Sequence, residues 1–323
     1  SMLGVTHIID LEIVNDLVLW VATDQGVLKI NTMTDDITRF SNSDTLPSSR
    51  RLADNLIHDI LPINDKIWVA TGSGVVIIDT TSNNVTNFSS DLIARVITQD
   101  DDGDIWLGTE MDGIYTMPSA LLEDIIKGND FELEGHVFDP LFPDGISSSQ
   151  ITCVSQDKEG MIWIGTNGGL NKYSKQEDTF KHYFVEDGLP SNYVTGVVVD
   201  DNNGLWISSK KGISFFDQKD LTFTNYGLTD GIGNIDFHRH SYDESPDGSI
   251  YFGGPLGITK VNPQAIQYND YVPPCVITRV KKNFFDESIS ETFLTTKAGF
   301  SDDENQNISI DHKIKSFTID FVA

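Results

Sequence analysis

The most constraining feature of this chain is a short pattern that recurs along most of its length. One copy is Ile162-Trp163-Ile164-Gly165-Thr166-Asn167-Gly168-Gly169-Leu170, in which an apolar strand-like run leads into a Thr-x-x-Gly turn. Five other copies begin at Trp20, Trp68, Trp106, Trp206 and Tyr251. The spacings between neighbouring copies are 48, 38, 57, 43 and 45 residues, and all five tryptophans of the protein stand at this one position. A period in this range indicates a repeat architecture.

Each repeat is predicted to form four short antiparallel strands. In the fifth repeat, the runs 194–200, 205–209, 213–217 and 221–226 are rich in apolar and β-branched residues, and Asn- and Gly-containing turns separate them. Sheets of four strands repeated every ~45 residues predict the blades of an all-β propeller. A helical solenoid is excluded because no 3.6-residue apolar period is sustained. The repeats are expected at 7–40, 57–88, 93–142, 151–184, 194–226 and 237–261, with one helix at 119–126 inserted in the third.

The repeated tryptophan is expected to be a packing residue. An indole offers about 150–250 Å² for burial, so it can wedge between neighbouring blades. Stacking on a sugar ring is the alternative, and it requires a copy that is exposed at the rim.

The composition restricts the possible partners. The formal net charge is −27 and the sequence pI is near 4.3. Such a field repels phosphate backbones and anionic lipid surfaces, so nucleic acid is not an expected partner. No apolar run reaches 18 residues, and the first residues do not resemble a signal peptide. Cys153 and Cys275 fall in different predicted units, which argues against a disulfide framework.

The repeats end near Pro273-Pro274, which predicts a domain boundary. We therefore expect a propeller over residues 1–270 and a second domain over 271–323. Strand-like runs at 275–280, 307–310 and 317–321 indicate the start of a truncated immunoglobulin-like β-sandwich. The chain stops within an apolar stretch, and we expect it to be a piece of a larger protein.

The repeats resemble a known family. Units of the form D-x-x-G-x-[IL]-W-[IV]-G-T-x-x-G-[LI], with Asp187-Gly188-Leu189-Pro190-Ser191-Asn192 between two of them, are similar to the two-component-regulator propeller repeat. The segment from Gly248 to Gly254, with Gly257-Ile258 and Asn262-Pro263, resembles the last repeat of such a propeller. Pro273-Pro274 followed by 276–280 and 316–323 resembles the opening of the triple-tyrosine (Y_Y_Y) immunoglobulin-like domain.

This order of parts is typical of the periplasmic half of hybrid two-component sensors of gut Bacteroidetes. The resemblance implies a periplasmic portion of an inner-membrane protein that binds an oligosaccharide and signals as a homodimer. It also implies an upstream propeller, and downstream transmembrane and kinase–response-regulator parts that lie outside this segment. Propellers of the family usually have seven blades. The six repeats therefore either close a ring themselves or form part of a seven-bladed one.

A ligand site is expected where the turns between second and third strands meet the connections between blades. The least blade-like residues there carry aromatic, guanidinium, amide or other polar groups, which are the groups that recognise sugars. They are Arg95, Asn192, Tyr193, Lys210, Asn234, Asp236, His238 and Arg239. The alternative for Asn192 and Asn234 is that they only cap turns.

Metal and catalytic sites are not predicted. The Asp100–Asp104 run lacks the ligand spacing of a calcium loop, so a hairpin turn is expected. His238 and His240 would share one face of a strand, but no third metal ligand is evident. No nucleophile elbow, phosphate loop or zinc-protease motif occurs, and nothing predicts a cofactor. Two alternatives to a sensor stay open: a propeller enzyme acting on polysaccharide, as a lyase or glycosidase, and a purely structural coupling propeller.

Overall fold

The computed structural model describes residues 7–89, 92–127, 133–266, 276–284, 289–293 and 314–322. The chain divides into two compact units, Ser1–Gln264 and Ala265–Ala323. The predicted boundary between 270 and 271 lies outside the described residues. Each unit is treated by itself.

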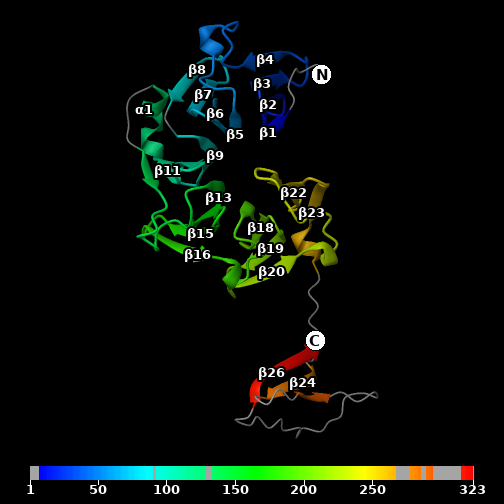
Figure 1. Ribbon diagram of the computed structural model, residues 1–323. Helices are drawn as coiled ribbons and strands as arrows, with labels where there is room; N and C mark the ends of the chain where they lie inside the picture. The colour runs from blue at the N-terminus through cyan, green and yellow to red at the C-terminus, as the bar shows by residue number, and fades with distance from the viewer. Residues whose placement is uncertain are drawn as a thin grey trace. The chain divides into compact units, whose positions relative to one another are not determined.

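The first unit is a β-propeller whose sheets follow one another around a common centre (Figure 1). Five blades have four antiparallel strands, and the sixth has three within the described part of the chain. Blade one contains β1 (Ile8–Val14), β2 (Val18–Thr23), β3 (Gly26–Asn31) and β4 (Ile37–Phe40); blade two contains β5 (Ile57–Ile63), β6 (Lys66–Thr71), β7 (Gly74–Asp79) and β8 (Val85–Ser89); blade three contains β9 (Ala94–Gln99), β10 (Ile105–Thr109), β11 (Ile114–Met117) and β12 (Glu134–His136); blade four contains β13 (Ile151–Gln156), β14 (Ile162–Thr166), β15 (Gly169–Ser174) and β16 (Thr179–Tyr183); blade five contains β17 (Val194–Val199), β18 (Leu205–Ser209), β19 (Gly212–Asp217) and β20 (Thr222–Tyr226); blade six contains β21 (Tyr242–Glu244), β22 (Ile250–Gly254) and β23 (Gly257–Val261).

The predicted propeller is confirmed, and so is the helix in the third repeat. That helix is a single 3₁₀ turn (Ser119–Leu121) followed by α1 (Leu122–Ile126), inserted between β11 and β12. Ile125 is buried and anchors the insertion to the core between blades two and three. The insertion explains why the third repeat is longer than the others.

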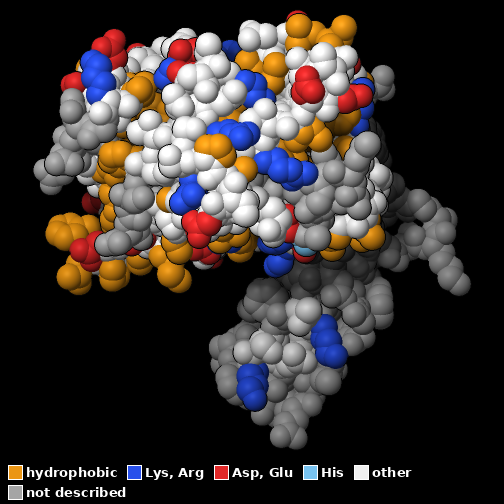
Figure 2. Space-filling model, turned by 90° about the horizontal axis from the view of Figure 1, so that it is seen from above, with side chains coloured by type: hydrophobic (Ala, Val, Ile, Leu, Met, Phe, Trp, Pro, Cys, Tyr) orange, Lys and Arg blue, Asp and Glu red, His pale blue; other side chains and the backbone are white. Residues whose placement is uncertain are grey.

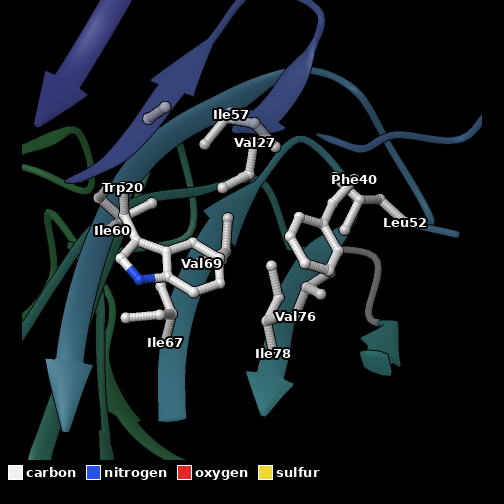
Figure 3. Close-up of a cluster of buried hydrophobic side chains, with 11 residues drawn as sticks. Trp20, Val27, Phe40, Leu52, Ile57, Ile60, Ile67, Val69, Val76 and Ile78 are labelled. Atoms are coloured by element: carbon white, nitrogen blue, oxygen red, sulfur yellow. The ribbon is translucent and has the colours of Figure 1, made fainter. Parts of the chain in front are cut away.

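The tryptophans pack between blades, as predicted. All five are at most 2% exposed, so none can stack on a ligand. Figure 3 shows the arrangement for Trp20 of blade one, which lies among Ile60, Ile67 and Val69 of blade two. The indole also stacks on Phe40, with ring centroids 5.6 Å apart. Burying one indole contributes roughly 4–6 kcal/mol as an upper bound from its apolar area.

The turn between the second and third strands has one geometry in blades one, two, four and five, with Ser209 in place of Thr in blade five, and blade three has one more residue between Thr109 and Gly113. In blade four, Thr166 Oγ1 donates to the Gly169 carbonyl at 2.9 Å and accepts from the Gly168 amide at 3.0 Å. The glycine that begins the third strand has positive φ, as at Gly26, where φ is 104°. The turn is therefore specified by residue type in each repeat.

A further contact holds blades three, four and five together, and the sequence analysis missed it. Asp157 begins the turn between β13 and β14, and its Oδ2 accepts a hydrogen bond from Trp163 Nε1 at 2.8 Å. Asp100 with Trp106 and Asp200 with Trp206 repeat this contact at 2.9 and 3.0 Å. The aspartate six residues before each of these tryptophans thus accepts hydrogen bonds from the amides of its own turn and fixes the orientation of the indole.

Blades one and six are separated by a cavity of about 760 Å³. Its walls include the exposed apolar residues Ile8, Leu11 and Ile13 of β1 and Ile258 of β23. Elsewhere in the propeller the corresponding space is filled by the next blade. Whether a seventh blade belongs here stays a prediction.

Exposed apolar residues also occur in the connection between blades three and four. Leu141 and Phe142 are 82% and 68% exposed, and Met111 in the β10–β11 turn is 75% exposed. Figure 2 shows hydrophobic side chains projecting from one edge of the molecule between polar and charged ones.

The second unit contains one antiparallel sheet in the order β25-β24-β26, with β24 at Val276–Phe284, β25 at Ile289–Phe293 and β26 at Ile314–Val322. The predicted strands at 275–280 and 317–321 coincide with β24 and β26, apart from residue 275. The predicted strand at 307–310 lies outside the described residues. Assignment of this unit to a Y_Y_Y domain stays a prediction.

Candidate functional site

A β-bulge at the same place in five blades shapes one face of the propeller. The inner strand of each blade has one extra residue near its start, opposite the end of the second strand. The bulge residues are Ile9, His58, Arg95, Thr152 and Thr195. Bulges re-aim side chains and are common beside binding sites. The predicted residue Arg95 is therefore placed by a local feature of the sheet.

Two further positions of the repeat meet on this face: the residue that follows the turn Thr or Ser, and the residue that precedes the inner strand. In five blades, the residue after the Thr or Ser of the turn donates its backbone N–H to the carbonyl of the residue immediately before the inner strand. In blade four Asn167 pairs with Gln150 at 3.3 Å, and in blade five Lys210 pairs with Tyr193 at 3.2 Å. The backbone bond is constant while the side chains differ from blade to blade. A fixed scaffold with variable polar side chains is what a binding face requires.

Five of the eight predicted site residues join in one network that crosses the face. Arg95 Nε forms an ion pair with Glu110, and the Arg239 guanidinium approaches the same Glu110 Oε2 at 3.7 Å. Arg239 Nε donates to the Tyr193 hydroxyl at 2.8 Å. A second ion pair, between Lys210 of blade five and Asp236 of the connection to blade six, adjoins these residues.

Lys210 completes this network from the turn of blade five. Its Nζ contacts Asp236 Oδ1 at 2.6 Å and lies 5.7 Å from the centroid of the Tyr193 ring. The Arg239 guanidinium lies 5.4 Å from the same ring. Side chains from blades three, five and six thus converge, and they are partly exposed: Arg95 30%, Arg239 26%, Lys210 37% and Asp236 50%.

Sequence reasoning missed several members of this face. Gln150 donates to Glu110 Oε1 at 2.9 Å and accepts from Asn167 Nδ2 at 2.6 Å, which links blades three and four. His58 accepts from Arg95 Nη1 through Nδ1 at 3.1 Å. Aligning the repeats on their Thr-x-x-Gly turns would have found Glu110 and Asn167, because both follow the turn threonine directly.

Three predicted residues lie outside the network. Asn192 Oδ1 accepts from the Val185 backbone at 2.8 Å, and buried Asn234 accepts from Leu256 N and donates to the Gly257 carbonyl. These two asparagines form turn-holding contacts, as the alternative interpretation expected. His238 is exposed, and its backbone N–H donates to the Gly253 carbonyl at 3.0 Å.

The expected strand containing His238 and His240 is wrong. These residues lie in a turn before β21, and His240 has a left-handed backbone with φ of 55°. His240 points toward Asp59 Oδ2 at 3.9 Å while His238 faces solvent, so the two rings do not share a face.

Below the binding face, inner strands of five blades line a cavity of about 240 Å³. Asp10 Oδ2 and Asp59 Oδ2 each accept a backbone N–H from the next blade, Ile60 at 3.1 Å and Ile97 at 2.8 Å. Burial, together with the nearby Asp10, raises the pKa of Asp59 well above its usual value. Burial also lowers the pKa of His240 to about 4. Through their hydrogen bonds to Ile60 and Ile97, the carboxylates of Asp10 and Asp59 join neighbouring blades.

Glu12 of β1 makes the stability of this region dependent on pH. Burial and the charges of Asp10 and Asp243 raise its pKa to about 7. The unfolded chain ionises this carboxyl near pH 4.5, whereas the folded chain retains the proton up to about pH 7. Ionisation therefore favours unfolding, and the cost grows as pH rises through this interval. We expect Glu12→Gln to be as stable as wild type near pH 4.5 and more stable at pH 8, by about 1 kcal/mol after allowance for solvent screening.

Urea denaturation of both proteins at pH 4.5, 6 and 8 measures this difference. Glu159→Gln, an exposed carboxyl in blade four, is the control and should show no pH-dependent gain. Equal stability of Glu12→Gln and wild type at pH 8 would contradict the raised pKa.

The Asp-rich turn of blade three is a hairpin turn, as predicted. The Asp100 and Gly103 amides close it through bonds to Asp104 and Asp100 carbonyls at 3.0 and 2.9 Å. Lys175 from blade four places its Nζ within 2.7–2.8 Å of the carboxylates of Asp100, Asp102 and Asp104. A lysine side chain therefore supplies the positive charge among these acids and ties blade three to blade four.

Across the described ranges, no group of three or more His, Cys, Asp or Glu side chains has an arrangement that could hold a metal ion. None of the described helices is long and apolar enough to cross a membrane.

Three segments of the chain match a known family. Residues 87–111, 145–168 and 188–211 match the two component regulator propeller family. A search of curated proteins gave no match.

Several solved structures share the fold. The extracellular domain of a Bacteroides thetaiotaomicron protein assigned as a hybrid two component system, BT3049, has a TM-score of 0.69 and 22% identity over 97% of this chain and 41% of that one. The extracellular domain of BT4673, from the same organism and assigned there as a one component system, has a TM-score of 0.60 and 16% identity over 88% of this chain and 37% of that one. Virginiamycin B lyase from Staphylococcus aureus has a TM-score of 0.56 and 12% identity over 90% and 86%.

This chain spans about two fifths of the length of the two Bacteroides extracellular domains. At these identities the likeness shows a common fold. The three matched segments confirm, for those stretches, the resemblance to the two component regulator propeller repeat that was seen in the sequence.

Proposed function

We propose that this chain is a ligand-sensing part of the extracytoplasmic region of a hybrid two component sensor, and that its ligand is an oligosaccharide. The three segments that match the regulator propeller family and the likeness to extracellular domains assigned to hybrid two component systems support a sensor. The observation that carries the ligand site is the network of Arg95, Glu110, Tyr193 and Arg239 across one face.

This face suits sugar recognition chemically. The Tyr193 ring provides an apolar surface for a sugar ring, and the amides of Gln150 and Asn167 provide donors and acceptors for hydroxyl groups. Its side chains come from four blades, so one bound ligand would contact several blades at once. A ligand that prefers one arrangement of the receptor would then shift the population toward that arrangement.

The remaining parts of the proposal follow the family resemblance. The receptor would be a homodimer in the inner membrane, with this segment in the periplasm and an upstream propeller before it. The second unit would begin a Y_Y_Y domain that leads to the transmembrane and kinase–response-regulator parts. In this proposal the segment itself binds and couples without catalysing a reaction.

A thermal-shift screen of this chain against plant and host oligosaccharides tests the ligand site. A ligand at 100 times its Kd adds about 2.7 kcal/mol to the stability of the folded state. We expect a dose-dependent shift, and we expect Tyr193→Ala to weaken binding by about tenfold or more because it removes the stacking surface and the hydroxyl partner of Arg239. Lys211→Ala, the exposed neighbour of Lys210, is the matched control and should bind as wild type.

Other outcomes favour the alternatives. Binding that appears only in the full extracytoplasmic region would place the site on the upstream propeller and make this propeller a structural coupler. Release of product from a glycan above a no-protein control would favour a polysaccharide lyase or glycosidase. The likeness to a lyase fold makes that control necessary.

A further inference from the structure

The binding face contains two arginines that share one carboxylate. Arg95 Nε and Arg239 Nη1 both reach Oε2 of Glu110. The other oxygen of Glu110 accepts from the neutral amide of Gln150 at 2.9 Å. Over the described residues, no other carboxylate lies within ion-pair distance of either guanidinium. Two positive charges therefore face a single negative one.

The other partners of these arginines are neutral. Arg239 donates to the Tyr193 hydroxyl, and Arg95 donates to Nδ1 of His58. Burial and the charge of Arg95 lower the pKa of His58 to about 4, so its imidazole is uncharged at neutral pH. With Nδ1 accepting, the ring proton lies on Nε2, and this buried atom has no hydrogen-bond partner among the residues that the structure describes.

The neighbouring ion pair of Lys210 and Asp236 does not change this excess of positive charge. Lys210 and Asp236 neutralise each other at 2.6 Å. Lys210 and Arg239 both lie against the Tyr193 ring, so cationic groups border the proposed sugar-stacking surface. The excess of positive charge is unusual in a chain with 22 Lys and Arg against 49 Asp and Glu. In a protein of net charge −27, general electrostatic attraction does not retain an anion, so a local site is needed.

We propose that the oligosaccharide bound at this face carries an anionic substituent, a carboxylate or a sulfate, that binds between Arg95 and Arg239. This inference rests on the proposed function. Guanidinium groups bind planar carboxylates and sulfate-type oxyanions through paired hydrogen bonds, and partial burial strengthens such bonds. The anion supplies the negative charge that Glu110 alone does not, while Tyr193 contacts the attached sugar ring.

Matched oligosaccharides test the inference by isothermal titration calorimetry. The carboxylate arm compares oligogalacturonides with their methyl esters, and the sulfate arm compares chondroitin sulfate oligosaccharides with desulfated ones. A panel of neutral plant and host oligosaccharides accompanies them. We expect one acidic member to bind, about tenfold or more tighter than its neutral counterpart, with affinity that falls as salt rises.

Variants connect that binding to the two arginines. Arg95→Gln and Arg239→Gln should each reduce affinity for the acidic ligand by about tenfold or more and make it less dependent on salt. Arg239→Lys keeps the charge and should lose less affinity than Arg239→Gln, which distinguishes ligand binding from a structural defect. Lys211→Ala should bind as wild type, and thermal unfolding verifies that every variant is folded.

Each contrary result has a distinct meaning. A neutral oligosaccharide that binds as tightly as its acidic counterpart, with Tyr193→Ala weakening both, overturns the anionic ligand and leaves the proposed function in place. Acidic binding that survives both glutamine substitutions also overturns it. If no oligosaccharide of either type binds this chain, the proposed ligand site fails, and the anionic ligand fails with it.

Discussion

Replacing Asp157 with alanine is expected to lower the free energy of unfolding by about 3–5 kcal/mol. The carboxylate is completely buried, and it accepts hydrogen bonds from the backbone amides of Glu159 and Met161 and from the indole of Trp163. Alanine leaves three donors without a partner inside the protein. The bond from the Trp163 indole is buried and the two amide bonds are partly buried. A buried donor that loses its acceptor costs the full desolvation penalty, which is larger than the net value of a hydrogen bond.

Asparagine at this position distinguishes the hydrogen bonds to the turn amides from the hydrogen bond to the Trp163 indole. Its carbonyl oxygen can still accept from the turn amides, but its NH₂ group would face the donating Trp163 indole. We expect Asp157→Asn to cost about 2 kcal/mol. Glu159→Ala, an exposed substitution in the same turn, should change stability by less than about 0.5 kcal/mol. Urea denaturation measures all three, and a cost below about 1 kcal/mol for Asp157→Ala would show that the indole contact is unimportant.

Replacing Gly26 with alanine is expected to cost about 3 kcal/mol or more. Gly26 begins β3 with φ of 104°, a conformation that residues with a side chain rarely adopt. A Cβ at this position would also collide with the carbonyl oxygen of Phe40 in the paired strand β4. Relieving both problems requires the strand to move, and Phe40 lies in the core between blades one and two.

Gly227 is the matched control for this substitution. It has extended backbone with φ of −135°, and a Cβ there would meet no atom within 4 Å. We expect Gly227→Ala to be neutral or to stabilise by about 0.5 kcal/mol, because it reduces the freedom of the unfolded chain. Similar losses for both substitutions, measured by urea denaturation, would mean that the turn geometry at Gly26 is not a specific requirement.

The candidate site could be predicted only in part. The face and five of its residues followed from the repeat pattern, because turns and blade connections occupy fixed places in a propeller. Glu110 and Gln150 were missed because neither is unusual in its own repeat. Their role depends on Arg239, which is far away in sequence and approaches only when the blades are assembled.

For Asn192 and Asn234, the sequence suggested a binding role that the structure does not show. Amides in loops suit ligand binding and turn capping equally well, and the sequence pattern is the same for both. The structure distinguishes them because their side chains contact backbone groups of nearby turns and loops. His238 and His240 were assigned to a strand because their spacing fits one, whereas the left-handed backbone of His240 ends that pattern.

The sequence by itself determined the blades of this protein. Alternating apolar residues, the turn threonine and the following glycine act within a few residues of one another, so each repeat specifies its own strands and turns. The tertiary structure decided what the blades do together: Lys175 enters the acidic turn of the preceding blade, and Arg95 and Arg239 meet at Glu110. These contacts join residues whose separation along the chain carries no local signal, because packing between blades alone brings them within reach.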